Sequence, residues 1–197
     1  MNSFSLKRSH KLAQDILDEY SNITEDFSRF QKESKLNCVS GCGKCCFKPD
    51  IYCSPIELLP LAMELLVRGQ AQAFYDKSLE TEDKRCLFLN VSNEENYQAS
   101  CSEYKYRPLT CRTFGVYGRH EKNSEIELFV CNLIKEYGPN EYNGYKGENK
   151  NIPLIDICKN RLIALDPQFL EMEYPINRSF RMILEKVLLA SMYENSN

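Results

Sequence analysis

The sequence predicts an α+β domain, dominated by helices, around an irregular cysteine-rich metal-binding centre with short β-hairpins. Apolar residues repeat at helical spacing toward both ends of the chain of 197 residues. Short apolar runs between turn residues fill its middle, and four of the ten cysteines fall within residues 38–46. We expect one domain over residues 1–197, with 38–131 as the cysteine-cluster core between N-terminal and C-terminal helices.

Composition and charge exclude several classes of protein. The net charge of −3 and the lack of a basic stripe argue against a nucleic-acid partner. No signal peptide opens the sequence, and no apolar run reaches the roughly 18 residues of a membrane span. We therefore expect a cytoplasmic protein with no membrane partner, whose cysteines are thiols or metal ligands, because that compartment disfavours disulfides. A protein partner is left open.

Helical segments flank the cysteines. Residues 5–33 carry an apolar stripe at spacings of three and four, which predicts an amphipathic helix that covers the cysteine core or, alternatively, binds a partner. The segment Ser54-Pro55-Ile56-Glu57 predicts a helix start with a capping box, and Pro60 predicts a kink or split soon after it. A second helix is expected at about 70–79. The stripe consists of Leu12, Ile16, Tyr20, Ile23, Phe27 and Phe30.

Short strands and one loop are expected among the later cysteines. The apolar run Cys86–Leu89 and the segment Tyr97–Tyr104 predict two strands or a loose hairpin. Residues 116–117 and 126–130 predict a second hairpin that ends at Cys131. Residues 137–151, rich in Gly and Asn, are expected to form an exposed loop.

Two helices are expected to complete the chain, beginning at Pro153 and Pro175. The first has Leu154, Ile157, Cys158, Leu162 and Leu165 on one face, and the second has Phe180, Ile183, Val187, Leu188 and Met192.

The segment Cys38-Val-Ser-Gly-Cys42-Gly-Lys-Cys45-Cys46 predicts a metal-binding loop. Its two glycines interrupt regular structure and allow the positive φ angles and close approach that wrapping around a metal requires. Thiolates select zinc, copper(I) or iron–sulfur clusters over magnesium or calcium. We expect zinc or an iron–sulfur cluster, of the 4Fe-4S type if the metal is iron.

The chain offers more thiols than one tetrahedral site uses. Adjacent Cys45 and Cys46 are expected to point in different directions, so that at least one serves a second metal or a second iron. Two adjacent sites, or one polynuclear site, would account for the excess. The expected ligands, all in loops or at strand ends, are Cys38, Cys42, Cys45, Cys46, Cys86, Cys101, Cys111 and Cys131.

The remaining cysteines and the histidines have other expected places. Cys158 lies on the apolar face of a predicted helix and is expected to be a buried core residue. Cys53 precedes a helix cap, and its role is left open between core and ligand. His10 and His120 are expected at the surface, with a nitrogen ligand as the alternative for His120.

The order of these residues resembles a known family. Over residues 38 to about 115 the chain resembles the YkgJ-like CxxCxxCC family of zinc- or iron-chelating cysteine-cluster proteins. The resemblance implies a small cytoplasmic metal-binding domain, and some members are labelled Fe–S oxidoreductases. The chain departs from the family at Gly115, where proline is common, and in its long C-terminal helices. The matching blocks are Cys38 with Cys42-Gly-Lys-Cys45-Cys46, then Cys86-Leu-Phe-Leu, then Cys101-x-x-Tyr104-x-x-Arg107-Pro108-x-x-Cys111-Arg112.

Two arginines accompany the last block. Arg107 and Arg112, with Tyr104, are expected to lie beside the ligands, where guanidinium groups offset the negative charge of several thiolates. The alternative for the arginines is an ion pair with Glu57 or another carboxylate that only holds the loop. Tyr104 and Pro108 are better explained as scaffold.

The spacing Cys38-x-x-x-Cys42-x-x-Cys45 admits a sharper hypothesis. Radical S-adenosylmethionine enzymes hold a four-iron cluster with this spacing, and some flagellin lysine methylases resemble relatives of this family. A protein lysine methylase is therefore the alternative function. Those enzymes set the loop after the first strand of a β/α barrel, whereas a long helix precedes it here. A saturated zinc-binding module without a substrate is a third class. The sequence identifies no catalytic residue, so whether the chain is an enzyme is left open.

Overall fold

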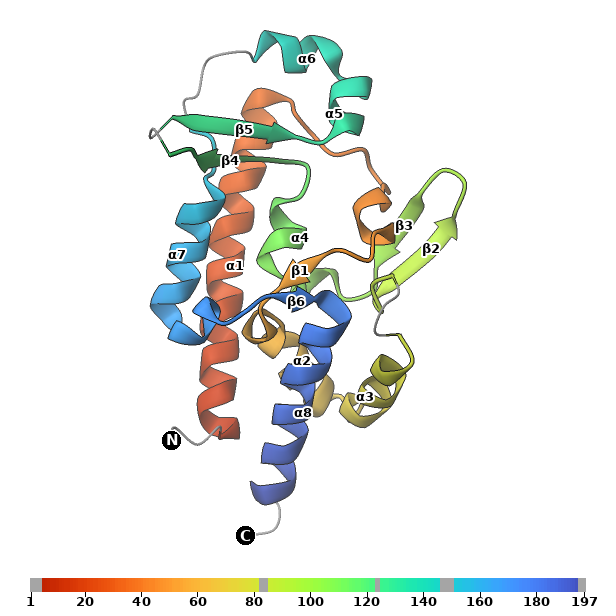
Figure 1. The fold of residues 1–197 in the computed structure, drawn as a ribbon, viewed down its shortest axis with the longest axis vertical. Helices are drawn as coiled ribbons and strands as arrows, with labels where there is room; N and C mark the ends of the chain where they lie inside the picture. The colour runs from red at the N-terminus through yellow and green to blue at the C-terminus, as the bar shows by residue number, and fades with distance from the viewer. Residues whose placement is uncertain (1–4, 82–84, 123–124, 146–150, 195–197) are drawn as a thin grey trace.

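The computed structural model describes residues 5–81, 85–122, 125–145 and 151–194. Helices form most of the molecule, and one β-hairpin crosses one end of the longest helix while another lies at the side of the molecule (Figure 1, top and right). This architecture confirms the predicted helix-dominated α+β class. The helices are α1 (Leu6–Ser34), α2 (Leu59–Val67), α3 (Ala71–Leu79), α4 (Leu109–Thr113), α5 (Asn132–Tyr137), α6 (Pro139–Gly144), α7 (Ile155–Leu165) and α8 (Ile176–Glu194).

All three sheets of the described residues are antiparallel pairs. They are β1 (Tyr52–Cys53) with β6 (Tyr174–Pro175), β2 (Leu89–Asn93) with β3 (Gln98–Cys101), and β4 (Val116–His120) with β5 (Ile126–Val130). Four 3₁₀ turns, η1 (Lys44–Phe47), η2 (Pro55–Leu58), η3 (Tyr104–Tyr106) and η4 (Pro167–Leu170), connect them to the helices.

Helix α1 is the predicted N-terminal amphipathic helix. Ser5 caps it by accepting a hydrogen bond from the Arg8 amide, and Lys35 ends it in the left-handed conformation at φ 59°. Five of the six predicted stripe residues are buried, which confirms that the stripe packs against the rest of the chain. The sixth, Leu12, is half-buried against the same core.

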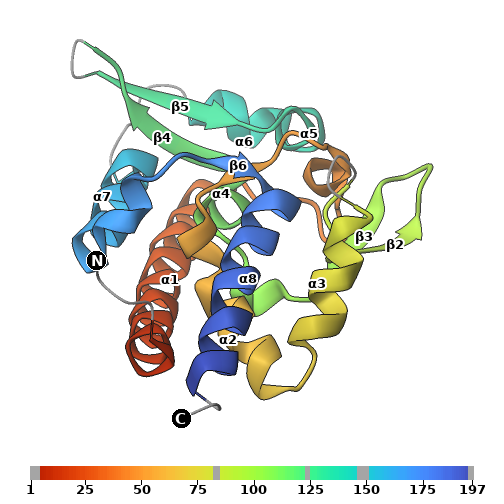
Figure 2. The same ribbon diagram turned by 60° about the horizontal axis from the view of Figure 1, so that its bottom comes forward.

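The main hydrophobic core lies where α1, α2 and α8 meet (Figure 2). Tyr20 and Phe180 are among its largest fully buried side chains. Phe88 packs edge-on against Phe180 with ring centroids 4.9 Å apart, and it stacks on Phe74 of α3 at 5.9 Å. Because Phe88 lies two residues after Cys86, this aromatic cluster fixes the cysteine segment to the helices.

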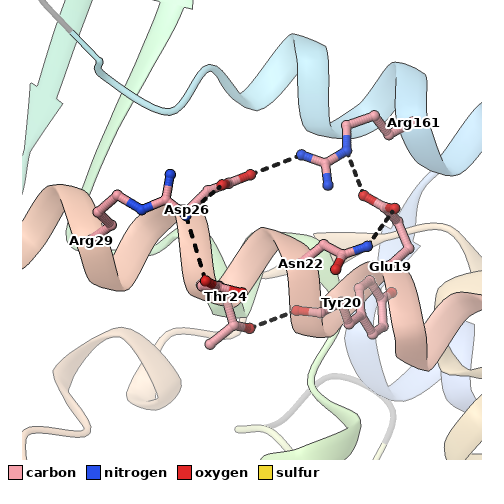
Figure 3. Close-up of polar contacts among 8 residues, drawn as sticks. Glu19, Tyr20, Asn22, Thr24, Asp26, Arg29 and Arg161 are labelled. Carbon is pink, nitrogen blue, oxygen red and sulfur yellow. Dashed lines mark hydrogen bonds and ion pairs between the residues drawn. The ribbon is translucent and has the colours of Figure 1, made fainter.

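Helix α7 is fastened to α1 by ion pairs from one arginine (Figure 3). The Arg161 Nε lies 2.6 Å from the Glu19 carboxylate, and its Nη1 donates to Asp26 at 2.9 Å. Thr24 turns its hydroxyl back onto the Tyr20 carbonyl at 2.7 Å, which leaves the other lone pair of that hydroxyl free to accept.

The predicted capping box is present, but it opens a 3₁₀ turn. The Ser54 amide donates to the Glu57 carboxylate at 2.9 Å at the start of η2. Helix α2 then begins at Leu59 with Pro60 in its first turn, where the missing amide costs no hydrogen bond. Pro60 therefore separates the two segments, as the split predicted at this residue requires.

Several predicted boundaries are wrong. The first strand, expected over Cys86–Leu89, is β2 at Leu89–Asn93, because its residues pair with β3 across the hairpin. Residues 139–144, expected in a loop, form α6, which Pro139 opens at the first turn. Residues 146–150 of that predicted loop lie outside the described residues.

The predicted apolar faces of the C-terminal helices are only partly buried. In α7, Cys158 and Leu162 are buried, whereas Ile157 and Leu165 are exposed. In α8, Phe180, Ile183 and Val187 are buried, Leu188 is half-buried and Met192 is exposed. No helix in the described ranges is both long and apolar enough to span a membrane.

Candidate metal centre

The loop of residues 38–46 lies between the two hairpins (Figure 1, orange). Gly41 has a φ of 74°, as predicted, and its carbonyl accepts from the Ala99 amide at 3.0 Å. Gly43 needs no positive φ, but a Cβ there would lie 2.5 Å from the Ala99 Cβ. Its amide donates to the Tyr97 carbonyl at 2.8 Å. Both glycines therefore serve the docking of the loop on β3.

The base of the β2–β3 hairpin brings two predicted ligands together. Cys101 ends β3 opposite Leu89, and the Leu89 amide donates to the Cys86 carbonyl at 3.1 Å. A further bond from the Ser102 amide to the Phe88 carbonyl, 2.9 Å long, closes this end of the hairpin. Antiparallel pairing thus places thiols that are 15 residues apart in sequence beside the 38–46 loop.

The base of the β4–β5 hairpin brings in another pair of segments. The Cys131 amide donates to the Gly115 carbonyl at 2.7 Å, just beyond the last pair of the ladder. Gly115 has a φ of 111°, and a Cβ built on it would lie 4.0 Å from the Cys38 Cβ. The position at which the family often has proline is therefore a close approach between the hairpin and the cysteine loop.

Helix α4 carries Cys111 into the same region. This short helix follows Pro108, and the amide of Leu109 in its first turn donates to the buried Glu57 carboxylate at 2.8 Å. Glu57 also caps η2 through Ser54, so one carboxylate joins the helical scaffold to the segment that presents Cys111. The capping box signals Glu57 in the sequence, but nothing there shows its second partner.

Cys45 and Cys46 do not diverge. Their Sγ atoms lie 3.8 Å apart, so the expectation that these neighbours point in different directions is wrong. The cause is η1, a tight 3₁₀ turn in which the Cys46 amide bonds to the Gly43 carbonyl at 2.7 Å. Both thiols line the same cavity, and the remaining cysteines must supply the other ligands of any metal site.

The thiols near the loop are held protonated by their surroundings. Burial of its thiol, and then the neighbouring Cys42, Cys45 and Cys131, raise the pKa of Cys38 to about 11, although the residue as a whole is exposed. Burial also raises the pKa of Cys86 to about 12, with smaller increases from Cys101 and Cys45. A bound cation would reverse this balance, because thiolates bind metals and thiols do not.

The other thiols of the region follow the same pattern. The hydrogen bond to Cys46, and then burial, raise the pKa of Cys45 well above its usual value. Burial, followed by Cys86 and Cys45, raises the pKa of Cys111, whereas Arg107 lowers it. These effects are consistent with Cys45 near Cys86, at the base of the β2–β3 hairpin, and near Cys111 on α4.

The two arginines have different surroundings. Arg112 is saturated: Nε donates to the Arg107 carbonyl at 2.7 Å, Nη1 donates to Thr24 at 3.0 Å, and Nη2 donates to the Lys105 carbonyl. Its guanidinium also covers the Tyr20 ring at 4.3 Å, so Arg112 ties α4 to α1. The alternative of an ion pair with Glu57 appears for neither arginine in the described residues.

Arg107 faces the thiols. Its guanidinium stacks on the exposed Tyr104 ring at 3.5 Å, and it lowers the pKa values of Cys101 and Cys111, each raised chiefly by burial. Its Nε is buried and has no hydrogen-bond partner among the described residues. A buried donor without an acceptor is costly, and a thiolate sulfur would satisfy it.

Two cysteines and both histidines lie elsewhere. Cys53 and Cys158 are buried in the main core, as predicted for Cys158. The Ser179 hydroxyl donates to the Cys53 carbonyl at 2.7 Å, so this backbone is part of the scaffold. His10 is exposed, and His120 lies 2.6 Å from Asp156 at the surface.

A cavity of about 490 Å³ adjoins the thiols, between α1 and the 38–46 loop. Its lining includes six of the eight predicted ligands, together with Tyr104, Arg107 and Arg112. Among the residues that the structure describes, no three Cys, His, Asp or Glu side chains are gathered tightly enough to hold an ion. The donor type and the unpaired Arg107 Nε fit a thiolate-bound metal, but the thiol side chains must turn toward a common centre to bind it.

Comparison with known families agrees with this geometry. Residues 37–132 match the family model CxxCxxCC, whose description is "Putative zinc- or iron-chelating domain". The matched segment contains all eight predicted ligands and excludes Cys158. Comparisons with curated proteins and with solved structures each found no significant match. Residues 37–132, a little under half of the chain, are thus similar to the CxxCxxCC family, described as a "Putative zinc- or iron-chelating domain".

Proposed function

We propose that this protein binds zinc or an iron–sulfur cluster through thiolates of Cys38, Cys42, Cys45, Cys46, Cys86, Cys101, Cys111 and Cys131. One observation supports the proposal: six of these eight thiols line the cavity between α1 and the 38–46 loop, whereas Cys53 and Cys158 lie in the apolar core. Structural packing alone would not require thiols at eight such positions.

The chain's own residues prepare the site for a cation. Thiols with raised pKa values must release protons on binding, so the metal is held only if several thiolates share its charge. Arg107 would offset the net negative charge of such a centre, and a thiolate would accept the hydrogen bond of its buried Nε. Zinc would make the centre a chelating or structural module, and an iron–sulfur cluster would supply electron transfer. A cytoplasmic location fits ten free cysteines.

The methylase alternative gains no support from the fold. The cysteine loop follows helix α1, and the strands of the described residues form separate antiparallel pairs instead of a parallel barrel. We therefore favour metal binding as the function. Methylase activity is worth testing only if a four-iron cluster is found.

The first test is metal analysis of protein purified without oxygen. We expect zinc, or iron with acid-labile sulfide and a broad visible charge-transfer band, at a fixed ratio to the chain. Cys42→Ser and Cys45→Ser should release metal and lower the melting temperature, because metal binding contributes to folding. Cys158→Ser is the matched control and should keep its metal. Full metal content in both loop variants would contradict the proposal.

A further inference from the structure

The eight thiols are divided by their surroundings into two groups of four. The inner group borders a small cavity of about 30 Å³ that is also lined by apolar side chains of the main core, among them Leu58, Leu61 and Phe88. Three members of this group also pack against that core. The inner group consists of Cys46, Cys86, Cys101 and Cys111.

The outer group gathers around Cys38. Cys38, Cys42 and Cys45 line the cavity of about 490 Å³, and Cys45 and Cys131 line one surface groove. Gly115 contacts both ends of the group, because it lies beside Cys38 and accepts the hydrogen bond of the Cys131 amide. Cys131 packs against a second, smaller core, formed by Phe30, Leu36, Val116, Val130, Ile134 and Ile152.

The groups meet at neighbouring residues. Cys45 belongs to the outer group and Cys46 to the inner group, and their Sγ atoms are 3.8 Å apart. Four thiolates complete a tetrahedral position, so each group has the number of donors that one zinc ion uses.

We propose that the cysteines form two adjacent metal positions of unequal exposure, an outer one of Cys38, Cys42, Cys45 and Cys131 and an inner one of Cys46, Cys86, Cys101 and Cys111. This inference rests on the proposed function. It adds the number of metal ions per chain and the cysteines that bind each ion. The outer position includes the exposed Cys38, so its metal exchanges with solution. Three ligands of the inner position, Cys86, Cys101 and Cys111, pack against the main core, so its metal exchanges more slowly, although Cys46, Cys101 and Cys111 also line the cavity of about 490 Å³.

Cobalt(II) is the probe that tests both points, because its thiolate complexes absorb visibly and it replaces zinc in tetrahedral sites. The full chain, reduced and metal-free, is titrated with cobalt(II) without oxygen and then mixed with excess EDTA. We expect two equivalents bound and release in two phases, one fast and one slow. One equivalent, or a single release phase, would overturn the inference while leaving the proposed function standing. No thiolate-bound cobalt at all would contradict the proposed function itself.

A double variant assigns the phases. Cys38→Ser with Cys131→Ser should reduce binding from two equivalents to one and remove only the fast phase. Loss of both equivalents, or of the slow phase alone, in a variant whose circular dichroism still shows folded helices would overturn the assignment. Cys158→Ser is the control for a cysteine outside both groups and should keep two equivalents and both phases. Because both outer cysteines lie away from the main core, this variant tests the inference even if inner variants do not fold.

Discussion

The helical scaffold and the thiol-rich region hold their structure in different ways. The scaffold buries a continuous core between α1, α2 and α8, where Tyr20 and Phe180 are fully buried. The thiol-rich region consists of two-stranded hairpins, a loop with one 3₁₀ turn, and a smaller core of six residues. Isolated two-stranded hairpins are marginal in water. The comparison teaches that the scaffold is stable by burial, whereas the thiol-rich region needs cross-links to become equally rigid.

The scaffold nevertheless decides where the thiols lie. Glu57 connects η2 to the helix that carries Cys111, and Phe88 anchors the segment that carries Cys86 between Phe74 and Phe180. Thiols held in place before metal arrives lose less conformational freedom on binding. We infer that disrupting the scaffold destabilises the whole chain, and that disrupting the thiol-rich region has local effects.

The largest effect on stability is expected in the scaffold. Leu65 of α2 is fully buried, so Leu65→Ala should lower the free energy of unfolding by about 2–5 kcal/mol through lost apolar contact and a residual cavity. Chemical denaturation measures the change. Metal bound per folded chain should not change, because Leu65 lies outside the thiol-rich region.

Val67, two residues later on the same helix, supplies the control. Its side chain is 73% exposed, so Val67→Ala should change the free energy of unfolding by no more than about 0.5 kcal/mol. A Leu65→Ala protein that remains as stable as Val67→Ala would contradict the description of this core. Loss of metal from folded Leu65→Ala would show that the two regions are not separable.

A smaller loss is expected where the cysteine loop docks on β3. In Gly43→Ala the new Cβ would meet the Ala99 Cβ, so loop and hairpin must separate, at a cost of about 1–3 kcal/mol. Hydrogen exchange should show faster exchange of the Gly43 and Ala99 amides, with little change in α8. Gly144→Ala is the control, because its Cβ meets nothing within 4 Å. Equal amide protection in both variants would refute the docking role of Gly43.

Substitutions of the two arginines should affect different properties, stability for Arg112 and metal retention for Arg107. Arg112→Gln removes the bonds to Thr24 and two carbonyls, so it should cost about 1–3 kcal/mol of stability while metal content is kept. Arg107→Gln should instead weaken metal retention against a chelator, because Arg107 faces the thiols. Denaturation and chelator competition on both variants separate these outcomes. Identical behaviour of the two variants would show that neither role is specific.

The sequence was sufficient for the scaffold because apolar periodicity reports directly on burial. The stripe from Ile16 to Phe30 and the capping box at Ser54 each arise from local rules, and both were found in the structure. The missed elements depend on contacts between distant segments. β1 pairs with β6 across more than 100 residues, and α4 depends on the Glu57 carboxylate.

Cysteine spacing pointed to six thiols that line one cavity, but it did not indicate their orientation. The expected divergence of Cys45 and Cys46 followed from their adjacency, and the turn η1 overrides it. The different surroundings of Arg107 and Arg112 also had no signal in the sequence, since both belong to one motif. Only the packing of Tyr20 and Thr24 beside Arg112 separates them.

The smallest expected effect is the response of the metal-free chain to alkaline pH. The pKa of Cys38 is raised to about 11 and that of Cys86 to about 12, against roughly 8.5 for an unfolded thiol. Above roughly pH 8.5 the unfolded state loses these protons first, so stability present below that pH declines as pH rises toward the folded-state values. A metal-bound thiolate has already lost its proton, and the metal-loaded chain should lack this component.

Melting temperatures of the reduced chain between about pH 7 and pH 10 test this difference, since the range spans the unfolded thiol pKa. Tyrosines and lysines also titrate there, so the informative comparison is between metal-free wild type and metal-free Cys86→Ser. Wild type should lose more stability over this range, because serine has no proton to release. A parallel decline in the two proteins would mean that the Cys86 thiol is not held protonated by the fold. The surroundings of Cys86 would then be less tightly packed in the metal-free chain than the apolar residues around it indicate.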